Sequence, residues 1–177
     1  QPGSNLTGNV TITGNESTTT ANSANYDPST ESLNLKGNVQ FENNNLMVSS
    51  ESALFSYSGG QILFDEAIFA LGSNTSRGNA DSVELQEKGI LNLRNVNYTT
   101  CPVGSNDWFI KAKKIVLNLD EGQAKADKVS LSFKDIPILY IPKISFPLGD
   151  ARKSGFLAPE IGGGGRSGNE IRLPWYW

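Results

Sequence analysis

Apolar and polar residues alternate along most of the first 133 positions, in short segments separated by polar turns. Leu33 and Leu35 share one face of such a segment, and Ile62 and Phe64 share one face of another. A two-residue period is typical of half-buried β-strands, and no segment has the 3.6-residue period of an amphipathic helix. The alternation therefore predicts one inward apolar face, made of Val10, Ile12, Leu33, Leu35, Val39, Phe55, Ile62, Phe64, Ile68, Leu91, Leu93, Ile115, Leu117, Val129, Leu131 and Phe133.

The alternating segments belong to an internal repeat. Gly8-Asn9-Val10 recurs 29 positions later as Gly37-Asn38-Val39, and the same step aligns 33–39 with 62–68. Each unit has a strand, a polar turn and a second strand. Such self-similarity at a fixed spacing indicates a repeat architecture. The predicted fold is all-β, a folded-over antiparallel sheet of repeated strand pairs, with turns rich in Gly, Pro, Asp and Ser at 27–32, 56–61, 86–89 and 119–123.

The segment 135–150 departs from this pattern because it is apolar but carries a proline at every fifth position. Pro137, Pro142 and Pro147 each lack the amide donor that a central strand needs. An extended strand at the edge of the sheet is therefore expected here. Beyond it, a charged hinge leads to a closing hairpin whose glycine-rich loop is 162–168.

Composition and charge exclude several function classes. The chain has 177 residues, 37% of them hydrophobic and 19% charged, with a net charge of −3 and a pI near 5.0. An acidic chain argues against nucleic acid as a partner. No apolar run reaches the roughly 18 residues of a membrane-spanning helix, although barrel strands would escape this test because their apolar residues only alternate.

Catalytic chemistry finds no support in the sequence. The chain has no histidine, which excludes Ser-His-Asp triads, Cys-His pairs and zinc sites built on histidine. The neighbouring carboxylates Asp65-Glu66 and Asp120-Glu121 would face opposite sides of a strand, so they do not form an acid–base pair. The segment 162–167 lacks the lysine of a phosphate loop. We expect no enzyme, no cofactor and no metal.

Two features keep more than one interpretation. Cys101 is either a buried small apolar residue or half of a disulfide whose partner lies outside this chain. The apolar face is either an ordinary sandwich core, or the lining of a trough that holds acyl chains.

Two long stretches, 97–115 and 136–162, carry a specific resemblance. The turn TTCPVGSNDW at 99–108, the proline-rich segment and RKSGFLAP at 152–159 occur in this order. Together they resemble the LptD family of lipopolysaccharide-assembly outer-membrane proteins, also called OstA or Imp. The repeats from residue 6 to about 133 are similar to its OstA-type β-jellyroll.

The resemblance implies a division of the chain. Residues 1–148 would be a periplasmic β-jellyroll that holds the acyl chains of lipopolysaccharide (lipid A) between its sheets. Residues 149–177 would be a hinge and the first two strands of an outer-membrane barrel whose remainder is absent. The implied partners are lipopolysaccharide, the periplasmic bridge protein LptA at the N-terminal edge strand, and the lipoprotein LptE with the full barrel. The implied location is the outer membrane, with the jellyroll facing the periplasm.

Three residues would carry family roles. The resemblance implies that Cys101 forms a disulfide with a barrel cysteine, and that Pro159 and Pro174 weaken strand pairing at the seam of the barrel. An alternative function needs no lipid site, namely a structural β-repeat that augments a partner sheet through the alternating segment 5–14. A carbohydrate-active enzyme lacks the paired carboxylates that it would need.

Overall fold

The structure is a computed structural model that describes residues 4–14, 16–72, 76–105 and 107–147, and the strand residues 155–156, 160–163, 169–172 and 175–176. Ten strands form one antiparallel sheet in chain order, with a single 3₁₀ turn, η1 (Glu87–Gly89), between β6 and β7. The strands are β1 (Ser4–Thr13), β2 (Ser17–Asp27), β3 (Ser32–Asn43), β4 (Leu46–Ser56), β5 (Gln61–Leu71), β6 (Ser76–Gln86), β7 (Ile90–Thr99), β8 (Trp108–Asn118), β9 (Gln123–Phe133) and β10 (Ile136–Pro147).

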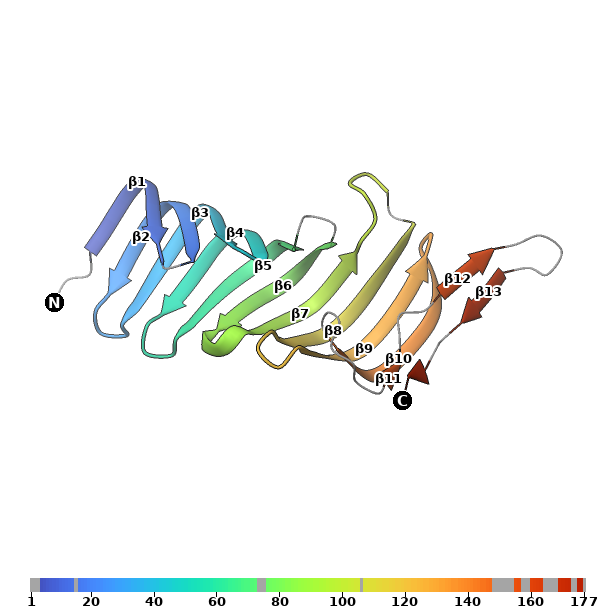
Figure 1. Cartoon of the computed structure of the whole chain (residues 1–177). Coiled ribbons are helices and arrows are strands. Elements are labelled where there is room, and N and C mark those ends of the chain that lie inside the picture. The colour runs from blue at the N-terminus through green and yellow to red at the C-terminus, as the bar shows by residue number, and fades with distance from the viewer. Residues whose placement is uncertain are drawn as a thin grey trace.

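The sheet forms an elongated stack, with β1 at one end and β10 at the other (Figure 1). Within the described residues, every strand of this ten-stranded sheet pairs only with its sequence neighbours, so each hairpin adds two strands to the stack. The all-β, folded-over sheet predicted from the alternation is confirmed, and it is consistent with the jellyroll-type domain that the resemblance implies. The predicted turns lie between β2 and β3, β4 and β5, β6 and β7, and β8 and β9.

Each strand from β4 to β10 bends near its middle, where two consecutive side chains point outward. On β5, Phe64 and Ala67 are fully buried while Asp65 and Glu66 between them are exposed. We call this line of outward residues the corner ridge. It comprises Glu51 and Ser52 on β4, Asp65 and Glu66 on β5, Asp81 and Ser82 on β6, Arg94 and Asn95 on β7, Lys113 and Lys114 on β8, Asp127 and Lys128 on β9, and Pro142 and Lys143 on β10.

The bend keeps its backbone polar groups satisfied, as buried polar groups require. Beside the ridge, the buried Ser50 hydroxyl lies 2.5 Å from the carbonyl oxygen of Asp65 and 2.7 Å from that of Ser52. The Ser52 amide donates to the same hydroxyl at 3.2 Å. One side chain therefore joins β4 to β5 at the point where both strands turn.

The bend folds the sheet over, so that its two halves face each other across one core. Phe41 is in register with Val48 and Phe69 on one side of the ridge, whereas Phe64 pairs with Ala53 on the other side. The two phenyl rings nevertheless meet edge to face, with centroids 5.6 Å apart. Edge-to-face contact at this distance is favourable between aromatic rings. The core thus lies between the halves of a single sheet.

The bend also corrects one sequence prediction, because Ile68 is 64% exposed rather than inward. In β3 three residues separate the buried Leu35 and Val39, and the register shifts between Lys36 and Val39, which marks an inserted residue. That insertion restores the two-residue period. In β5 only two residues separate Phe64 from Ala67 and the register does not shift, so the period is inverted beyond the corner.

The C-terminal segment agrees with the predicted edge strand. Within the described residues, β10 pairs only with β9 in the ten-stranded sheet. Further on, β12 (Glu160–Gly163) pairs antiparallel with β13 (Asn169–Arg172), and β11 (Gly155–Phe156) pairs with β14 (Trp175–Tyr176). Two predicted seam residues, Pro159 and Pro174, lie outside the described residues. The described part of the chain has no helix long and apolar enough to span a membrane.

A pair of neighbouring substitutions tests the inverted period on β5. We expect Ala67→Gln to lower the free energy of unfolding by about 2–4 kcal/mol, because an amide would enter a fully packed interior. The matched change Ile68→Gln should alter it by less than about 1 kcal/mol, the range of strand propensity at an exposed position. Urea unfolding followed by circular dichroism measures both. Equal losses would contradict the inversion.

Candidate functional site

Inward side chains that pair across successive strands form unbroken apolar rows along the long axis of the stack. One row lies on the half of the sheet that holds Phe64. Each member pairs in register with the next, and the row runs through Ala24, Leu35, Ala53, Phe64, Val83, Leu93, Ile115 and Ala126. Since strands β2–β9 all contribute, the interior presents one continuous apolar lining.

The edge of the interior opposite the corner is less enclosed than its centre. Phe55, Ile62 and Leu85 occupy the row farthest from the corner on one half, and Leu71 and Tyr98 lie away from the corner on the other. All five are only partly buried, although they pack against the core. We call these two rows the lips. Apolar surface of the interior therefore reaches solvent along the lips.

Most of the predicted inward residues line this interior. Nine are buried, namely Leu33, Leu35, Val39, Phe64, Leu91, Leu93, Leu117, Val129 and Leu131. Five are partly buried against the core, namely Val10, Ile12, Phe55, Ile62 and Ile115. The exceptions are Ile68, which points outward, and Phe133, which is 41% exposed at the end of β9.

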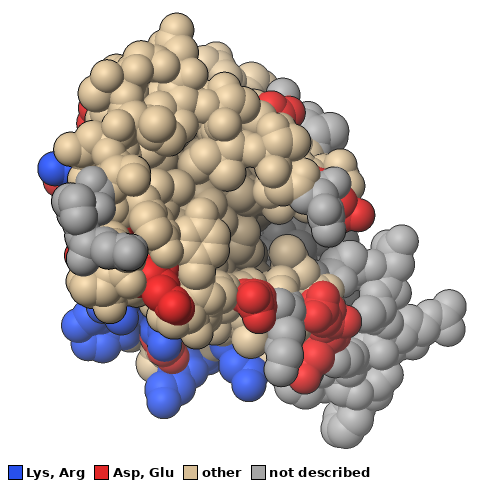
Figure 2. All heavy atoms as spheres, turned by 90° about the vertical axis from the view of Figure 1, so that its left-hand side faces the viewer, with Lys and Arg blue, Asp and Glu red and all other residues tan. Residues whose placement is uncertain are grey.

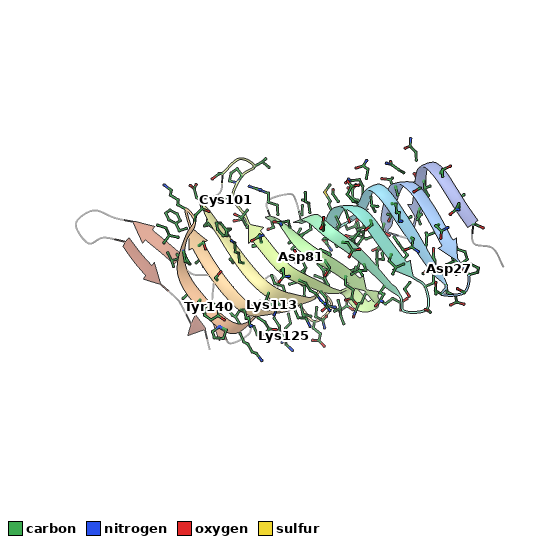
Figure 3. The ribbon with its side chains drawn as sticks, turned by 180° about the vertical axis from the view of Figure 1, so that it is seen from behind. Asp27, Asp81, Cys101, Lys113, Lys125 and Tyr140 are labelled. Carbon is green, nitrogen blue, oxygen red and sulfur yellow. The ribbon has the colours of Figure 1, made fainter. Side chains whose placement is uncertain are left out.

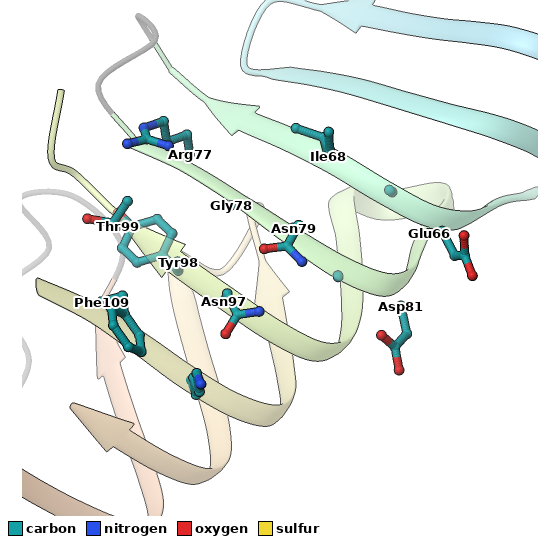
Figure 4. A pocket seen from close by; sticks show the side chains of 13 residues that line it. Glu66, Ile68, Arg77, Gly78, Asn79, Asp81, Asn97, Tyr98, Thr99 and Phe109 are labelled. Carbon is teal, nitrogen blue, oxygen red and sulfur yellow. The ribbon is translucent and has the colours of Figure 1, made fainter. Parts of the chain in front are cut away.

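A groove on the outer face of the sheet was not predicted. It has a volume of about 760 Å³ and crosses β5–β8 on the side where Ile68 emerges (Figure 4). Its lining is mixed, with amides, carboxylates, two cationic side chains and two aromatic residues, Tyr98 and Phe109. Within the described residues no three potential metal ligands cluster. The alternating pattern does not indicate this groove, because it places Ile68 on the inward face. Its outward side chains include Ile68, Asn79, Asn97, Phe109 and Lys111.

Arg77 holds the loop that contains Cys101. Its Nε donates to the carbonyl oxygen of Cys101 at 3.1 Å, and its Nη2 donates to those of Pro102 at 3.0 Å and Ser105 at 3.2 Å. The planar guanidinium can make such divergent bonds, which a lysine ammonium would not reproduce. Cys101 is a free thiol with 8% exposure beneath this loop.

Thr99 sets the surroundings of the thiol. Its hydroxyl donates to the Trp108 carbonyl oxygen at 2.7 Å and accepts the Cys101 amide at 3.0 Å. Hydrogen bonding to Thr99, and then to the Trp108 backbone, lowers the pKa of the Cys101 thiol below its usual value, while desolvation opposes this. This shift favours the thiolate form, while the loop above it limits the access of reagents to the sulfur.

Comparison with known proteins identifies the family. No family model matches the chain. The LPS-assembly protein LptD of Saccharophagus degradans is 34% identical over 172 residues, which cover 97% of this chain and 20% of the relative. LptD of Pseudomonas savastanoi is 38% identical over 143 residues, and that of Nitrosomonas europaea is 31% identical over 170 residues. They cover 81% and 96% of this chain, and 15% and 24% of those relatives. The chain belongs to the LptD family.

The match to the LptD family covers nearly all of this chain but only a small part of each relative. The chain spans about a fifth of the length of the curated relatives it matches. The family resemblance read from the turn 99–108 and the proline-rich segment is confirmed. The match therefore concerns this part of an LptD protein and not the activity of the whole protein.

Loss of the arginine clamp should expose the Cys101 thiol. We expect Arg77→Ala, and also Arg77→Lys, to increase the rate of Cys101 alkylation by iodoacetamide at least about tenfold, since three hydrogen bonds from a charged donor stabilise the loop. Mass spectrometry of the intact chain measures the rate. Arg94→Ala, which removes an exposed arginine elsewhere, is the control and should change little. Unchanged alkylation in both Arg77 variants would disprove the clamp.

Proposed function

We propose that this chain takes part in lipopolysaccharide assembly, and that its interior holds the acyl chains of lipopolysaccharide. The observation that carries the proposal is the continuous apolar lining of β2–β9, which reaches solvent along the lips. Membership of the LptD family supports the general role, since its relatives are named for LPS assembly. No catalytic step is involved in this function.

The energetics favour acyl chains over the charged part of the lipid. Each methylene group removed from water contributes about 0.8 kcal/mol. The net charge of −3 gives little attraction for phosphates overall. In this structure Phe41 and Phe64 meet across the interior, so chain entry requires the lips to separate. The partly buried residues of the lips would be the first to contact an acyl chain.

The proposal extends to the rest of the chain and its partners. Residues 1–148 would face the periplasm, and 149–177 would begin an outer-membrane barrel that assembles with LptE. The antiparallel pairing of β12 with β13 supports a hairpin in this segment. Cys101 would form a disulfide with a cysteine outside this chain. Pro159 and Pro174 would weaken strand pairing at the barrel seam.

β1 offers a docking edge for the bridge protein LptA. Within the described residues it pairs on one side only, with β2, and most of its side chains are exposed. A free strand edge of this kind can be extended by a strand from a partner. This feature also supports the second candidate function, a structural repeat that docks a partner sheet without holding lipid.

Photo-crosslinking at the lips separates the two candidates. A photoreactive phenylalanine at Phe55 or Ile62 should capture lipopolysaccharide, because both side chains lie inward and partly exposed. The same group at the chain neighbours Leu54 and Leu63 serves as the control, since these belong to the opposite face. Immunoblotting of the crosslinked lipid measures capture. Equal capture at all four positions would refute an interior site and leave the scaffold function.

Proline substitution tests the β1 edge. Of the adjacent amides at Thr11 and Ile12, one faces β2 and the other the free edge, because strand amides alternate in direction. We expect one of Thr11→Pro and Ile12→Pro to keep the thermal midpoint of the chain yet lose binding to purified LptA in a pull-down. If the variant that keeps its midpoint also keeps binding, the edge is not the contact.

A further inference from the structure

The corner ridge changes sign along its length. Over β4–β6 its charged members are all acidic, and over β7–β10 they are basic except for one aspartate. At the junction, the Asn95 side-chain amide donates to the Asp81 carboxylate at 2.6 Å. We call the second part the basic ridge. Its exposed cations are Arg94, Lys113, Lys114, Lys128 and Lys143, and Asp127 is half-buried among them.

The basic ridge stands out against the charge of the whole chain. Residues 1–89 carry three basic and ten acidic side chains, a net charge of −7, whereas residues 90–147 carry eight basic and five acidic ones, a net charge of +3. Lys113 and Lys125 lie along one edge of the β8–β10 end, on the same side as Tyr140 (Figure 3). From the β1 end, basic side chains are likewise seen gathered along one edge of the molecule (Figure 2).

Apolar surface lies directly beside these cations. A groove of about 530 Å³ has five cationic side chains around it, together with Tyr140 and Pro142 from the edge strand β10. Tyr140 is 60% exposed, and Ile138, two residues before it on the same strand, is 37% exposed. The outer face of β10 is therefore apolar where it adjoins the basic ridge. Cations next to exposed aliphatic and tyrosine side chains are the composition of an interfacial membrane-binding surface.

We propose that the basic ridge and the outer face of β10 together dock on the surface of an anionic phospholipid bilayer. The lysines and the arginine bind headgroup phosphates, and Tyr140 and Ile138 insert at the boundary between headgroups and acyl chains. Basic residues near an anionic bilayer surface are attracted within a Debye length of about 8 Å at physiological ionic strength. This surface is on the outside of the sheet, so its lipid is a bilayer contact distinct from any acyl chain in the interior.

A second copy of the chain is the competing occupant, because the acidic part of the ridge could engage the basic part of another molecule. Glu51, Asp65, Glu66 and Asp81 supply the complementary charges. Pairing between two copies would depend only on the charged side chains of the ridge. A bilayer accounts both for the cations and for the exposed apolar side chains of β10, which is why we favour it.

Vesicle binding by the full 177-residue chain tests the proposal. We expect cosedimentation with phosphatidylcholine vesicles that contain phosphatidylglycerol to exceed that with pure phosphatidylcholine, and the difference to fall as salt is raised. Lys113→Gln with Lys114→Gln should weaken binding to the anionic vesicles about tenfold or more, since each basic residue adds to the attraction. Lys36→Glu changes the net charge by the same amount on β3 and should have little effect.

Two further measurements keep the result decisive. Tyr140→Ser should weaken anionic-vesicle binding at high salt, where the apolar contribution remains, and hydrogen exchange should slow in β10 but not in β4 when vesicles are added. Equal binding to neutral and anionic vesicles, or equal loss in the Lys36 and Lys113/Lys114 variants, would overturn the proposal. The proposal would also be overturned if the chain self-associates in a salt-sensitive way, does not bind vesicles, and loses this self-association in the Lys113/Lys114 variant. Sedimentation measures the self-association. Crosslinking at the lips is unaffected by any of these outcomes.

Discussion

The mid-strand bend is the constraint on which the rest of this structure depends. A ten-stranded sheet that stayed flat would leave one apolar face in water, and the described residues contain no helix beyond the three-residue turn η1 that could cover it. Turning two consecutive side chains outward near the middle of the strands, or three residues in β3, folds the sheet onto itself, so that its own two halves cover each other. The contact between Phe41 and Phe64 is the direct result. The interior, the lips and the corner ridge all follow from this one bend.

The sequence predicted most of this arrangement because a two-residue period survives on either side of the bend. Strand class, hairpin turns, the edge position of β10 and fourteen of sixteen inward residues could be inferred from alternation, proline and glycine. The outward position of Ile68 could not be inferred, because the sequence does not indicate whether the strand has an inserted residue at its bend. β3 has the insertion at Gly37-Asn38, where φ is positive at both residues, and β5 bends at Glu66 without one. Asparagine and glycine often adopt positive φ and therefore indicate such a position in a sequence, whereas glutamate does not.

The features that the alternation missed lie on the outer face, where no burial pattern constrains the residue types. The outer groove depends on Ile68 emerging from β5, and the basic ridge depends on register that brings Lys114 and Lys143 on either side of Asp127. Spaced tens of residues apart, these cations do not form a charge run in the sequence. Only the ordering of strands, each beside its neighbour, gathers them at one end of the stack while the acidic residues collect toward the other.

The bend also determines the line about which the two halves of the sheet could rotate. In the proposed binding of acyl chains, separation of the lips would be a rotation of the two halves about the corner, because the corner is where every central strand passes from one half to the other. On the odd-numbered strands this position carries residues with positive φ, Asn9, Asn38, Glu66, Asn95 and Lys128, a backbone region that costs free energy for residues other than glycine. The hydrogen bonds of Ser50 and the Asn95–Asp81 bond cross between strands there and hold the bend in register. The residues that set the angle between the halves are thus neighbours of the charges on the ridge, so the interior and the outer ridge share one line of backbone.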